Sequence, residues 1–452
     1  MTEPIKDKQI GPYRVVMVAA CPFPANHGTP GAIRELALFL AKQGHDTHVV
    51  TYPIKEDLPV DDLTIHRVKA PAFMKSGGVR IGPSLDRLVY DFLLIWKLIS
   101  VIRRNNIQII HAHNYEALLI GTIAKWFTGR PLVYTGVNNM ADELPLYRII
   151  RPDGLARALG RFVDYTFPRG ADIVMALSDE LKNYLIGMGI SGERIIVIPP
   201  GVDPDMFVNG DGSKVRQRHQ IRDDQPVIMY TGALEAFQQL EILFEAMPGV
   251  VEKYPQAMLM MVGNIPNPKN QRKFEQLAQE LGVEENVSFI KSLALSDLPD
   301  YLAAADVAVV PRPTCPGFPV KLLNYMAAGK AIVSAHGSAK TLCHGFNGFV
   351  AKDYDSGSLA DGINLLISDP ELRAIIGKRA KDAIPGTYDW DTIARGTALV
   401  YKQMLAGKSL DKTALDGNIK ASYLPAFSQD SMPDPNCPHG FLATGPIEYP
   451  EF

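Results

Sequence analysis

The residues best suited to chemistry lie late in the chain, in the stretch 311–334 between two apolar runs. Pro319 suits the first turn of a helix, where a missing N–H costs nothing, and Gly329 suits the position that ends the helix. Lys321 then falls in the first turn, where a cation opposes the helix dipole. An anion in front of the helix accounts for that cation, and Gly317 lets backbone approach the anion closely. The stretch predicts a phosphate-type site in a Rossmann-like domain.

Two further side chains are expected to join this site. Arg312 follows an apolar run at the edge where ligand sites form, and its planar fork can bind two phosphate oxygens. Asn324 stands three residues after Lys321, near the same helix face, where an amide can bond a ribose hydroxyl. The alternative for Lys321 is an exposed helix lysine. Glu235 either accepts from sugar or ribose hydroxyls or is a solvated loop charge.

The first half of the chain carries a second set of candidates. His111 and His113 stand at the end of a predicted strand, and we expect only one of them, the later His113, to face a ligand. The alternative is a structural histidine held by hydrogen bonds. Glu116, three residues further on, either orients an acceptor hydroxyl or caps the helix predicted over 117–126.

A loop rich in proline and glycine is predicted between the first strand and the first helix. It contains Gly28, Thr29 and Gly31, whose spacing is not G-x-G-x-x-G, and no acidic residue closes the second strand. This argues against a nicotinamide-binding fingerprint. We expect the loop to touch a donor phosphate or an acceptor; the alternative is a simple tight turn.

Composition narrows the class of protein. The 452 residues point to two or three domains, and a net charge of -3 gives no general preference for nucleic acid or anionic membrane. The four cysteines are far apart and lack CxxC pairing, so neither a disulfide framework nor a zinc site is expected, and a reducing cytoplasm fits. The N-terminus has no apolar core of a signal peptide.

Strand and helix patterns alternate along the chain, which predicts an α/β fold with right-handed βαβ units. We expect two Rossmann-like domains facing across a cleft: 1–203, completed by a helix at about 389–406, and 204–388. The tail 407–452 has no periodicity and is predicted to be irregular. The predicted strands are 13–20, 47–52, 63–68, 107–112, 132–135, 172–177, 227–230, 258–262, 287–290, 307–310 and 331–334, and the segment 194–203 ends the first half.

Taken in order, these features resemble the family-4 retaining glycosyltransferases of GT-B fold. The resemblance is carried by the loop 22–31, the strand end 111–113, the linker 200–203 and the element 317–329, and it extends over 13–405. It implies a nucleotide-sugar donor bound mainly by the C-terminal half and an acceptor bound by the N-terminal half. It also implies that neither a metal nor another cofactor is needed.

The resemblance assigns roles to individual residues. His113, Lys321 and Arg312 would be catalytic, the histidine touching the donor sugar and the two cations its diphosphate. Gly28, Thr29, Gly31 and Glu116 would serve the acceptor or a phosphate. The donor-binding residues would be Gly232, Glu235, Gln238, Gly263, Asn264, Gly317, Phe318, Pro319 and Asn324.

The chain departs from the commonest pattern of that family. Ala233 and Gln238 stand where G-R-L-x-x-x-K-G has its cations, and Pro316 and Asn324 replace the E-x7-E pair. A histidine expected after the strand 132–135 is also missing. A divergent branch carries G-x-x-E-x-x-Q-G, a Pro-Arg and a P-x-K instead. The residues that match this branch are Glu235, Gln238, Arg312, Pro319 and Lys321.

Two other functions stay open at this point: a catalytically silent protein that binds nucleotide sugar or glycan, and a sugar-nucleotide epimerase. The acceptor is a glycan, a lipid carrier or a small molecule, and no nucleic-acid partner is expected. Arginines punctuate the apolar stretch 148–169, which is either a solvated helix face or a contact with the inner face of a membrane. The apolar helix expected over 84–104 is interpreted as a packed helix, with a membrane-surface role as the alternative.

Overall fold

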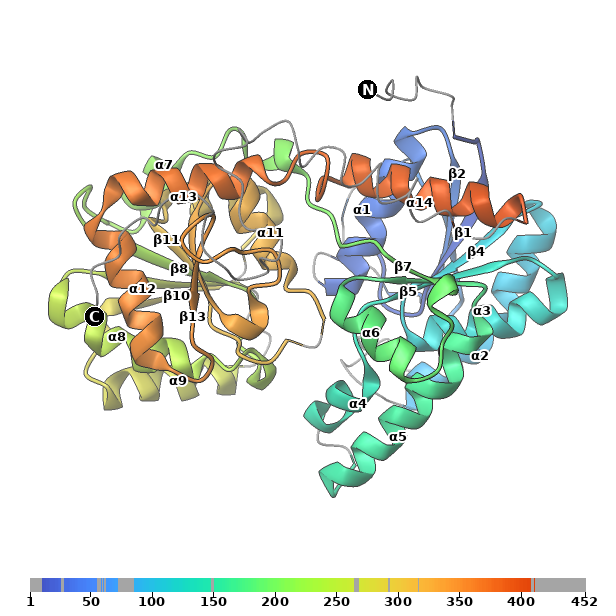
Figure 1. Cartoon of the computed structure of the whole chain (residues 1–452), viewed down its shortest axis with the longest axis horizontal. Coiled ribbons are helices and arrows are strands. Elements are labelled where there is room, and N and C mark those ends of the chain that lie inside the picture. The colour runs from blue at the N-terminus through green and yellow to red at the C-terminus, as the bar shows by residue number, and fades with distance from the viewer. Residues whose placement is uncertain are drawn as a thin grey trace. The chain divides into compact units, whose positions relative to one another are not determined.

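A computed structural model describes residues 10–25, 28–54, 58, 60, 62–71, 85–147, 150–263, 268–291, 293–315, 317–407 and 410 (Figure 1). These residues form two compact units. The C-terminal unit runs from Val202 to Asp389, except for Gly317 and Phe318. The N-terminal unit holds the described residues up to Gly201, those two residues, and the described residues 390–407 and 410. The division after Gly201 lies two residues from the predicted one.

The described part of the N-terminal unit contains a seven-stranded parallel sheet, with strand order β3-β2-β1-β4-β5-β6-β7. The central strand β1 is largely apolar and has five buried residues in six, as expected for a parallel strand covered on both faces. The order reverses between β1 and β4, the place where such sheets form ligand sites. The strands are β1 (Arg14–Ala19), β2 (Asp46–Thr51), β3 (Thr64–Arg67), β4 (Ile109–Ala112), β5 (Leu132–Gly136), β6 (Ile173–Ala176) and β7 (Ile195–Val197).

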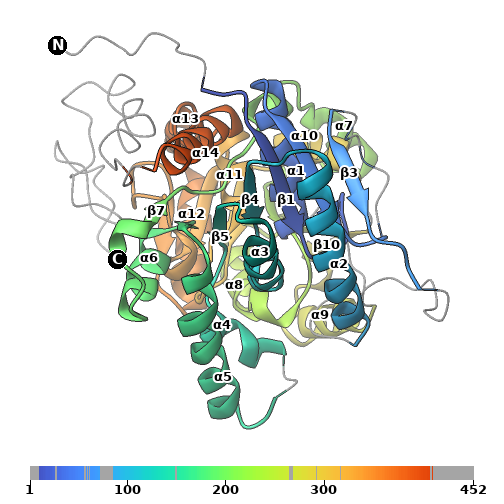
Figure 2. The same cartoon turned by 90° about the vertical axis from the view of Figure 1, so that its right-hand side faces the viewer.

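Helices cover both faces of this sheet (Figure 2). One face packs against α2, α3 and α6, through side chains such as Leu94, Leu118 and Leu185. The other face packs against α1 and the last helix α14, through Leu40 and Ile393 among others. The helices of this unit are α1 (Gly28–Lys42), α2 (Leu85–Arg104), α3 (Tyr115–Thr128), α4 (Met140–Glu143), α5 (Asp153–Thr166), α6 (Asp179–Gly187) and α14 (Trp390–Leu405).

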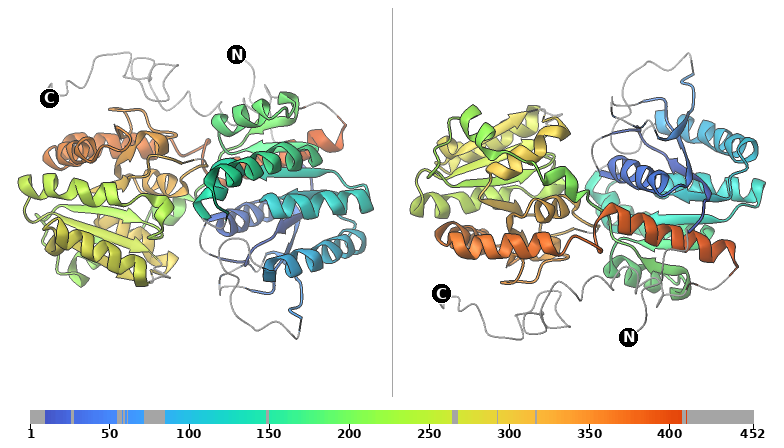
Figure 3. Two further views of the ribbon diagram at one scale, coloured as in Figure 1. Left: turned by 90° about the horizontal axis from the view of Figure 1, so that it is seen from below. Right: turned by 90° about the horizontal axis from the view of Figure 1, so that it is seen from above.

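The C-terminal unit repeats the design with a six-stranded parallel sheet, order β10-β9-β8-β11-β12-β13, in its described residues. Helices again lie on both sides (Figure 3), and α8, α9 and α12 share one core with the sheet. The strands are β8 (Val227–Thr231), β9 (Met258–Gly263), β10 (Val287–Lys291), β11 (Val307–Val310), β12 (Ala331–Ala335) and β13 (Phe349–Ala351). The helices are α7 (Gly212–Arg218), α8 (Glu241–Lys253), α9 (Pro268–Glu280), α10 (Leu298–Ala304), α11 (Val320–Ala327), α12 (Ser356–Ser368) and α13 (Pro370–Asp382).

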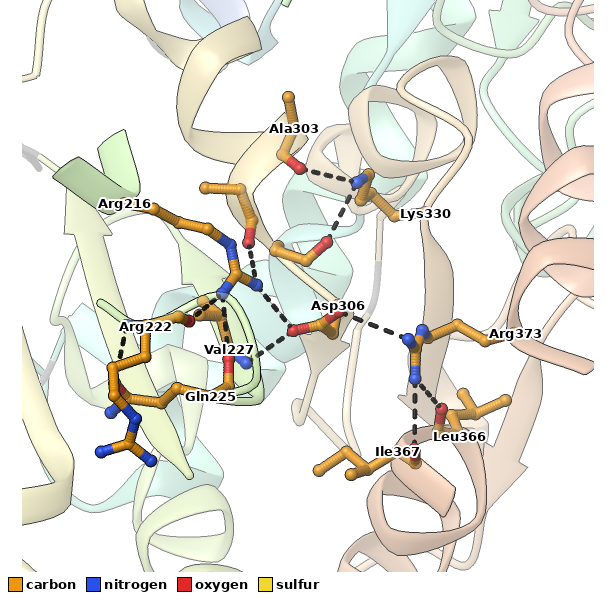
Figure 4. Close-up of polar contacts among 12 residues, drawn as sticks. Arg216, Arg222, Gln225, Val227, Ala303, Asp306, Lys330, Leu366, Ile367 and Arg373 are labelled. Atoms are coloured by element: carbon orange, nitrogen blue, oxygen red, sulfur yellow. Dashed lines mark hydrogen bonds and ion pairs between the residues drawn. The ribbon is translucent and has the colours of Figure 1, made fainter. Parts of the chain in front are cut away.

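A charged network joins elements at the amino ends of these strands (Figure 4). The Asp306 carboxylate accepts from Arg216 Nη2 at 3.0 Å and from the Val227 N–H at 2.9 Å, and Arg373 approaches it to 3.5 Å. Lys330 donates to two main-chain carbonyls, and burial lowers its pKa to about 8. Each cation is bound by protein groups and the network lies at the strands' starts, so its role is structural.

The expected α/β fold is confirmed, and each predicted strand is present within two residues of its predicted ends. The pattern does not predict the two short strands β7 and β13. One local prediction is wrong: Gly28, Thr29 and Gly31 do not form a loop but the first turn of α1. Gly28 opens that helix with φ +50°, a conformation that glycine adopts without strain. Most of the tail 407–452, with Cys437, lies outside the described residues.

Candidate active site

Two glycines lie against each other at the carboxyl ends of the neighbouring strands β8 and β9. Gly232 follows β8 with φ +134°, and its N–H donates to the Val262 carbonyl at 2.9 Å. A Cβ on Gly263, the last residue of β9, would lie 2.3 Å from the Gly232 carbonyl oxygen. Neither position therefore tolerates a side chain, and the backbone is open to close approach at this edge.

Lys321 lies against this glycine edge. It is the second residue of α11, which Pro319 precedes as N-cap residue with a φ of -78°. The Lys321 Nζ donates to Gln238 Oε1 at 3.2 Å and lies 3.9 Å from the centre of the Tyr230 ring. A Cβ on Gly232 would come within 2.8 Å of that Nζ, so the glycine makes room for the ammonium group. Burial, and then the charge of Arg312, lower the Lys321 pKa well below its usual value.

Arg312 stands two residues beyond β11 at the same edge. Its Nε donates to the Thr314 carbonyl at 2.7 Å, and its guanidinium lies 5.2 Å from the centre of the Phe237 ring. Ser338 Oγ donates to the Arg312 carbonyl at 2.6 Å and fixes the backbone there. Within the described part of the chain, neither Arg312 nor Lys321 has a carboxylate partner. Two cations thus share one edge without an acidic residue to neutralise them; we call them the cation pair.

The neighbouring polar candidates divide into engaged and free side chains. Gln238 is engaged, because its Oε1 accepts from Lys321. Glu235 and Asn324 make no side-chain hydrogen bond or ion pair to any other described residue, and both are half-buried. Asn324 lies on α11, one turn after Lys321. Glu235 precedes a short 3-10 turn over Ala236–Gln238 without capping it by its side chain. Both remain available to ligand hydroxyls.

Three predicted donor-site residues need separate mention. Gly317 and Phe318 group with the N-terminal unit rather than with the unit that holds the cation pair. Asn264 lies outside the described residues. Gly329 follows α11 with φ +66°, and its N–H donates to the Met326 carbonyl at 2.9 Å, as expected for the glycine that ends the helix.

In the N-terminal unit the two histidines at the end of β4 stack on each other. The centres of the His111 and His113 rings are 4.1 Å apart, with 29° between the planes. The expectation that only one of them faces the ligand edge because they alternate was wrong: residues i and i+2 lie on one side of a strand. What separates the two is their partners. Both ring nitrogens of His111 are engaged, Nδ1 with Tyr401 Oη at 2.6 Å and Nε2 with Thr135 Oγ1 at 2.7 Å.

His113 is the histidine with free capacity. It is buried, with 4% of its surface exposed, and its Nε2 has no partner among the described residues. Burial lowers the His113 pKa to about 3, so the ring is neutral at physiological pH. A buried imidazole nitrogen without a hydrogen bond is costly unless a ligand completes it. Of the two histidines, His113 is therefore the candidate for ligand contact.

Glu116 does not cap α3. Asn114 does, its Oδ1 accepting from the Ala117 N–H at 2.7 Å. Glu116 instead pairs with Arg87 Nη2 at 3.1 Å, and that same nitrogen donates to the Ala20 carbonyl at the end of β1. The carboxylate thus lies at the carboxyl edge of the sheet, and it is already partly neutralised.

The sequence did not single out several residues near this edge. Tyr52, at the end of β2, donates to Asp91 on α2 at 2.5 Å, and burial raises the Asp91 pKa to about 6. Tyr401, which holds His111, lies 290 positions further along the chain. Asp91 carried a signal, since it interrupts the apolar helix 84–104. Tyr401 and Thr135 carried none, because a buried tyrosine or threonine is ordinary in a core.

Two family descriptions match the chain, one for each unit. "Glycosyltransferase Family 4" matches residues 28–206, and "Glycosyl transferases group 1" matches residues 211–383. With two parallel α/β units and a cation pair at the carboxyl edge of the second, the protein is a glycosyltransferase of GT-B fold. It belongs to the family-4 glycosyltransferases.

Curated relatives share about a quarter of their residues with the chain. A D-inositol 3-phosphate glycosyltransferase of Acidothermus cellulolyticus is 26% identical over 436 residues, covering 87% of this chain and 91% of the relative. One from Kribbella flavida is 26% identical and covers 65% of this chain and 71% of the relative. A GDP-mannose-dependent alpha-(1-6)-phosphatidylinositol monomannoside mannosyltransferase of Mycobacterium tuberculosis is 25% identical, covering 50% of this chain and 60% of that enzyme.

Solved structures share the fold. Sucrose-phosphate synthase from Thermosynechococcus elongatus superposes with a TM-score of 0.75 at 19% identity, covering 88% of this chain and all of that one. The Anabaena protein HepE, solved in complex with UDP and glucose, gives a TM-score of 0.69 at 20% identity, covering 86% of this chain and 99% of that one.

Proposed function

We propose that the protein transfers a hexose from a nucleoside-diphosphate sugar to a hydroxyl of its acceptor, with retention of the anomeric configuration and without a metal ion. One observation carries the proposal: Lys321 and Arg312 share a strand edge without a carboxylate partner in the described residues, beside two glycines that open the backbone. A diphosphate is the ligand that such an edge fits best. HepE, of the same fold, was solved with UDP, which supports this donor class.

The cation pair would act on the leaving group. As the bond between the sugar C1 and the diphosphate oxygen breaks, negative charge grows on that oxygen, and Lys321 and Arg312 are fixed where they can stabilise it. The first N–H groups of α11 point the same way. The acceptor oxygen bonds to C1, and its proton passes to the departing phosphate. No step in this scheme needs a metal.

The other residues would hold the sugar and the acceptor. The free Nε2 of neutral His113 can donate to or accept from a sugar hydroxyl. Glu235 and Asn324 can bind hydroxyls of the sugar or the ribose. Glu116, with Arg87 beside it, can orient an acceptor hydroxyl. The relatives' names show acceptors as different as an inositol phosphate and a phosphatidylinositol mannoside, so the acceptor class is left to experiment.

The test begins with the donor. Thermal unfolding is followed with UDP, GDP and their sugars; a ligand at 100 times its dissociation constant adds about 2.7 kcal/mol of stability. The sugar derivative of the nucleotide that binds is then supplied as donor with EDTA present, and release of the free nucleoside diphosphate is measured. We expect slow release that persists in EDTA and is lost in Lys321→Ala and in Arg312→Gln. The anomeric proton of the first product formed reports retention or inversion.

Other outcomes assign another function. Nucleotide-sugar binding without release of diphosphate, with or without candidate acceptors, indicates a silent binding protein. Inversion at the sugar 2-position indicates an epimerase. Lack of binding by any nucleoside diphosphate contradicts the proposal, because the cation pair then has no anion to hold.

We propose further that α5 touches an anionic membrane surface. Leu155, Leu159 and Phe162 form an exposed apolar stripe on this helix, and Arg157 and Arg161 are exposed beside it without an acidic partner in the described chain. Helices that carry an apolar stripe and cationic side chains typically lie at the membrane–water interface of anionic bilayers. None of the described helices is long and apolar enough to cross a membrane.

A flotation assay tests this contact. Vesicles with anionic lipid are compared with neutral ones, using the full chain and Leu159→Asp with Phe162→Asp. A second apolar face provides the control: α2 and α3 pack together and expose Phe92, Trp96 and Trp126, the last with 77% of its surface. We expect anionic vesicles to bind the protein and the α5 variant to lose binding. Loss in Trp126→Gln instead, with the α5 variant unaffected, contradicts the assignment to α5.

A further inference from the structure

The orientation of the His113 ring depends on its neighbour His111, two residues earlier in the chain. Its ring is buried and its Nε2 is unpartnered among the described residues, so no hydrogen bond at that nitrogen fixes how the ring lies. Among the described residues, His113 stacks on the ring of His111, with 4.1 Å between the ring centres and 29° between the ring planes. The plane of His111 therefore sets the surface on which His113 rests.

His111 is held at both of its nitrogens. Nδ1 bonds Tyr401 Oη at 2.6 Å and Nε2 bonds Thr135 Oγ1 at 2.7 Å. A neutral imidazole donates from one nitrogen and accepts at the other, and each of the two hydroxyls can do either, so the two bonds together fix the plane of the His111 ring in either tautomer. All three side chains are buried, and rotation of the His111 ring would leave polar atoms without partners.

We infer that Tyr401, on the C-terminal helix α14, is a positioning residue for His113, which it holds through His111. Thr135 at β5 serves as the second support. The inference rests on the proposed function in one respect: the orientation matters because the His113 Nε2 is to meet a substrate hydroxyl. Residues that contact a ligand are commonly held in place by a second layer of hydrogen-bonded residues behind them. Here the Tyr401 hydroxyl would hold the His111 ring, and the His111 ring would hold the stacked His113 ring.

The supports lie on firm elements. Tyr401 is fully buried in the core that α14 shares with the sheet, and its ring meets His111 edge-on, with 5.8 Å between centres. Thr135 lies on β5, which pairs in parallel with β4, the strand that bears His111. Each support is thus carried by an element of regular structure rather than by a loop, and the two reach opposite ends of the His111 ring.

The experiment reads the histidine rings directly. The full chain is labelled with ¹⁵N-histidine, and the long-range ¹⁵N–¹H pattern reports the tautomer of each ring; His113→Gln assigns the resonance. Three variants are compared: Tyr401→Phe, Thr135→Val and the control Tyr184→Phe. The control loses a tyrosine hydroxyl bond in the same unit, to Asp164 Oδ2 at 2.7 Å, without touching either histidine.

In the unaltered protein we expect neutral rings for His111 and His113, each with one well-defined ¹⁵N–¹H pattern. In Tyr401→Phe and Thr135→Val, where the His111 ring keeps only one of its two bonds, we expect a changed pattern at His111 and a changed His113 resonance, whereas Tyr184→Phe keeps both patterns. In turnover assays we expect Tyr401→Phe to lower kcat at least about tenfold, as misplacement of a contact group does, with the donor Kd within about twofold.

An unchanged His113 resonance in Tyr401→Phe and in Thr135→Val overturns the inference, whatever the activity. Equal changes at His113 in Tyr184→Phe also overturn it, because the effect is then a general one of a lost hydroxyl. Should Tyr401→Phe fail to fold, Thr135→Val removes the other bond to the same ring and decides. A protein that releases no diphosphate from any sugar donor counts against the proposed function, and the ring patterns still decide the positioning.

Discussion

Lys321 lies in surroundings that disfavour its own charge. Its amine sits over the Tyr230 ring and beside Gln238, and no carboxylate among the described residues faces it. Burial, with Arg312 as the second cause, lowers its pKa well below the usual value. At a pH above this lowered pKa, the amine gains a proton when an anion arrives, since the opposite charge then favours the ammonium form. Charge at the site is thus completed by the ligand.

We therefore predict that binding of a nucleoside diphosphate takes up a proton. Above the lowered pKa of Lys321 the free amine is neutral, and the diphosphate raises that pKa, so affinity falls as pH rises through the window between the two values. Calorimetric titrations in buffers of different ionisation heat measure the uptake. Lys321→Met should bind more weakly without this uptake, and Arg312→Gln should take up less.

The lowered pKa of Lys321 also determines how the stability of the unliganded protein depends on pH. The folded chain binds fewer protons at Lys321 than the unfolded chain does, between the lowered and the ordinary pKa. The free energy of unfolding therefore rises with pH across that window and is lost as pH falls toward the lowered pKa. An unliganded protein whose stability, relative to Lys321→Met, does not depend on pH would contradict both expectations.

At the scale of elements, one carboxylate fixes the segment that follows β5. Asp164 on α5 is fully buried. It accepts from the N–H groups of Met140 and Ala141 at 2.9 and 3.0 Å and from the hydroxyls of Tyr115 and Tyr184. Four donors replace the water that the charge has lost, and the short helix α4 is thereby tied to α5.

We predict that Asp164→Asn destabilises the N-terminal unit by about 3 kcal/mol, since hydrogen bonds to a charged group contribute about 1.5–3 kcal/mol each and an amide can accept at one oxygen only. Chemical denaturation monitored by circular dichroism measures the loss. Asp153→Asn, on the exposed first turn of the same helix, should stay within about 0.5 kcal/mol of the parent. Equal losses in the two variants would show that Asp164 has no special role.

Elements were predictable where a local pattern decides them. The strand Val307–Val310 was placed to the residue, because a parallel strand covered on both faces is continuously apolar. The helix 117–126 was placed too short, since Asn114 rather than a later residue caps α3. The proline and glycine residues at the start of α1 predict a loop, yet proline fits the first helical turn and Gly28 supplies a positive φ, so the helix begins there.

The candidate site was predictable in part, for a different reason. Lys321 was found because a cation at a helix start conflicts with the dipole, which is a local signal. The bonds that fix a site are long-range: Gln238 reaches Lys321 across 83 positions and Tyr401 reaches His111 across 290. No local pattern encodes such pairs. The groups that could react are therefore predictable from a sequence, whereas the distant residues that hold them in place are not.

At the scale of the whole molecule, the two units differ in whether they are formed by one continuous segment of the chain or by several. The C-terminal unit is one continuous segment, from Val202 to Asp389, apart from the loop at Gly317 and Phe318. The N-terminal unit is discontinuous, because its sheet is covered on one face by α14. Gln43 at the end of α1 reinforces this, its Nε2 donating to the Asp391 carbonyl and carboxylate, both at 2.8 Å. Each unit nevertheless has its own core.

We predict that the segment 202–389 folds alone and still binds the nucleoside diphosphate, whereas the segment 1–389 keeps only one cooperative transition, that of the C-terminal unit. Removing α14 uncovers the cores around Trp390, Ile393, Val400 and Tyr401. At about 2 kcal/mol for each buried large side chain, the loss of about 8 kcal/mol is comparable to the whole stability of a domain. Calorimetry with and without nucleotide separates the transitions, because ligand raises only the unit that binds it. A folded N-terminal unit in 1–389 would mean that α14 is an accessory, and a segment 202–389 that folds without binding nucleotide would mean that the cation pair alone does not make the donor site.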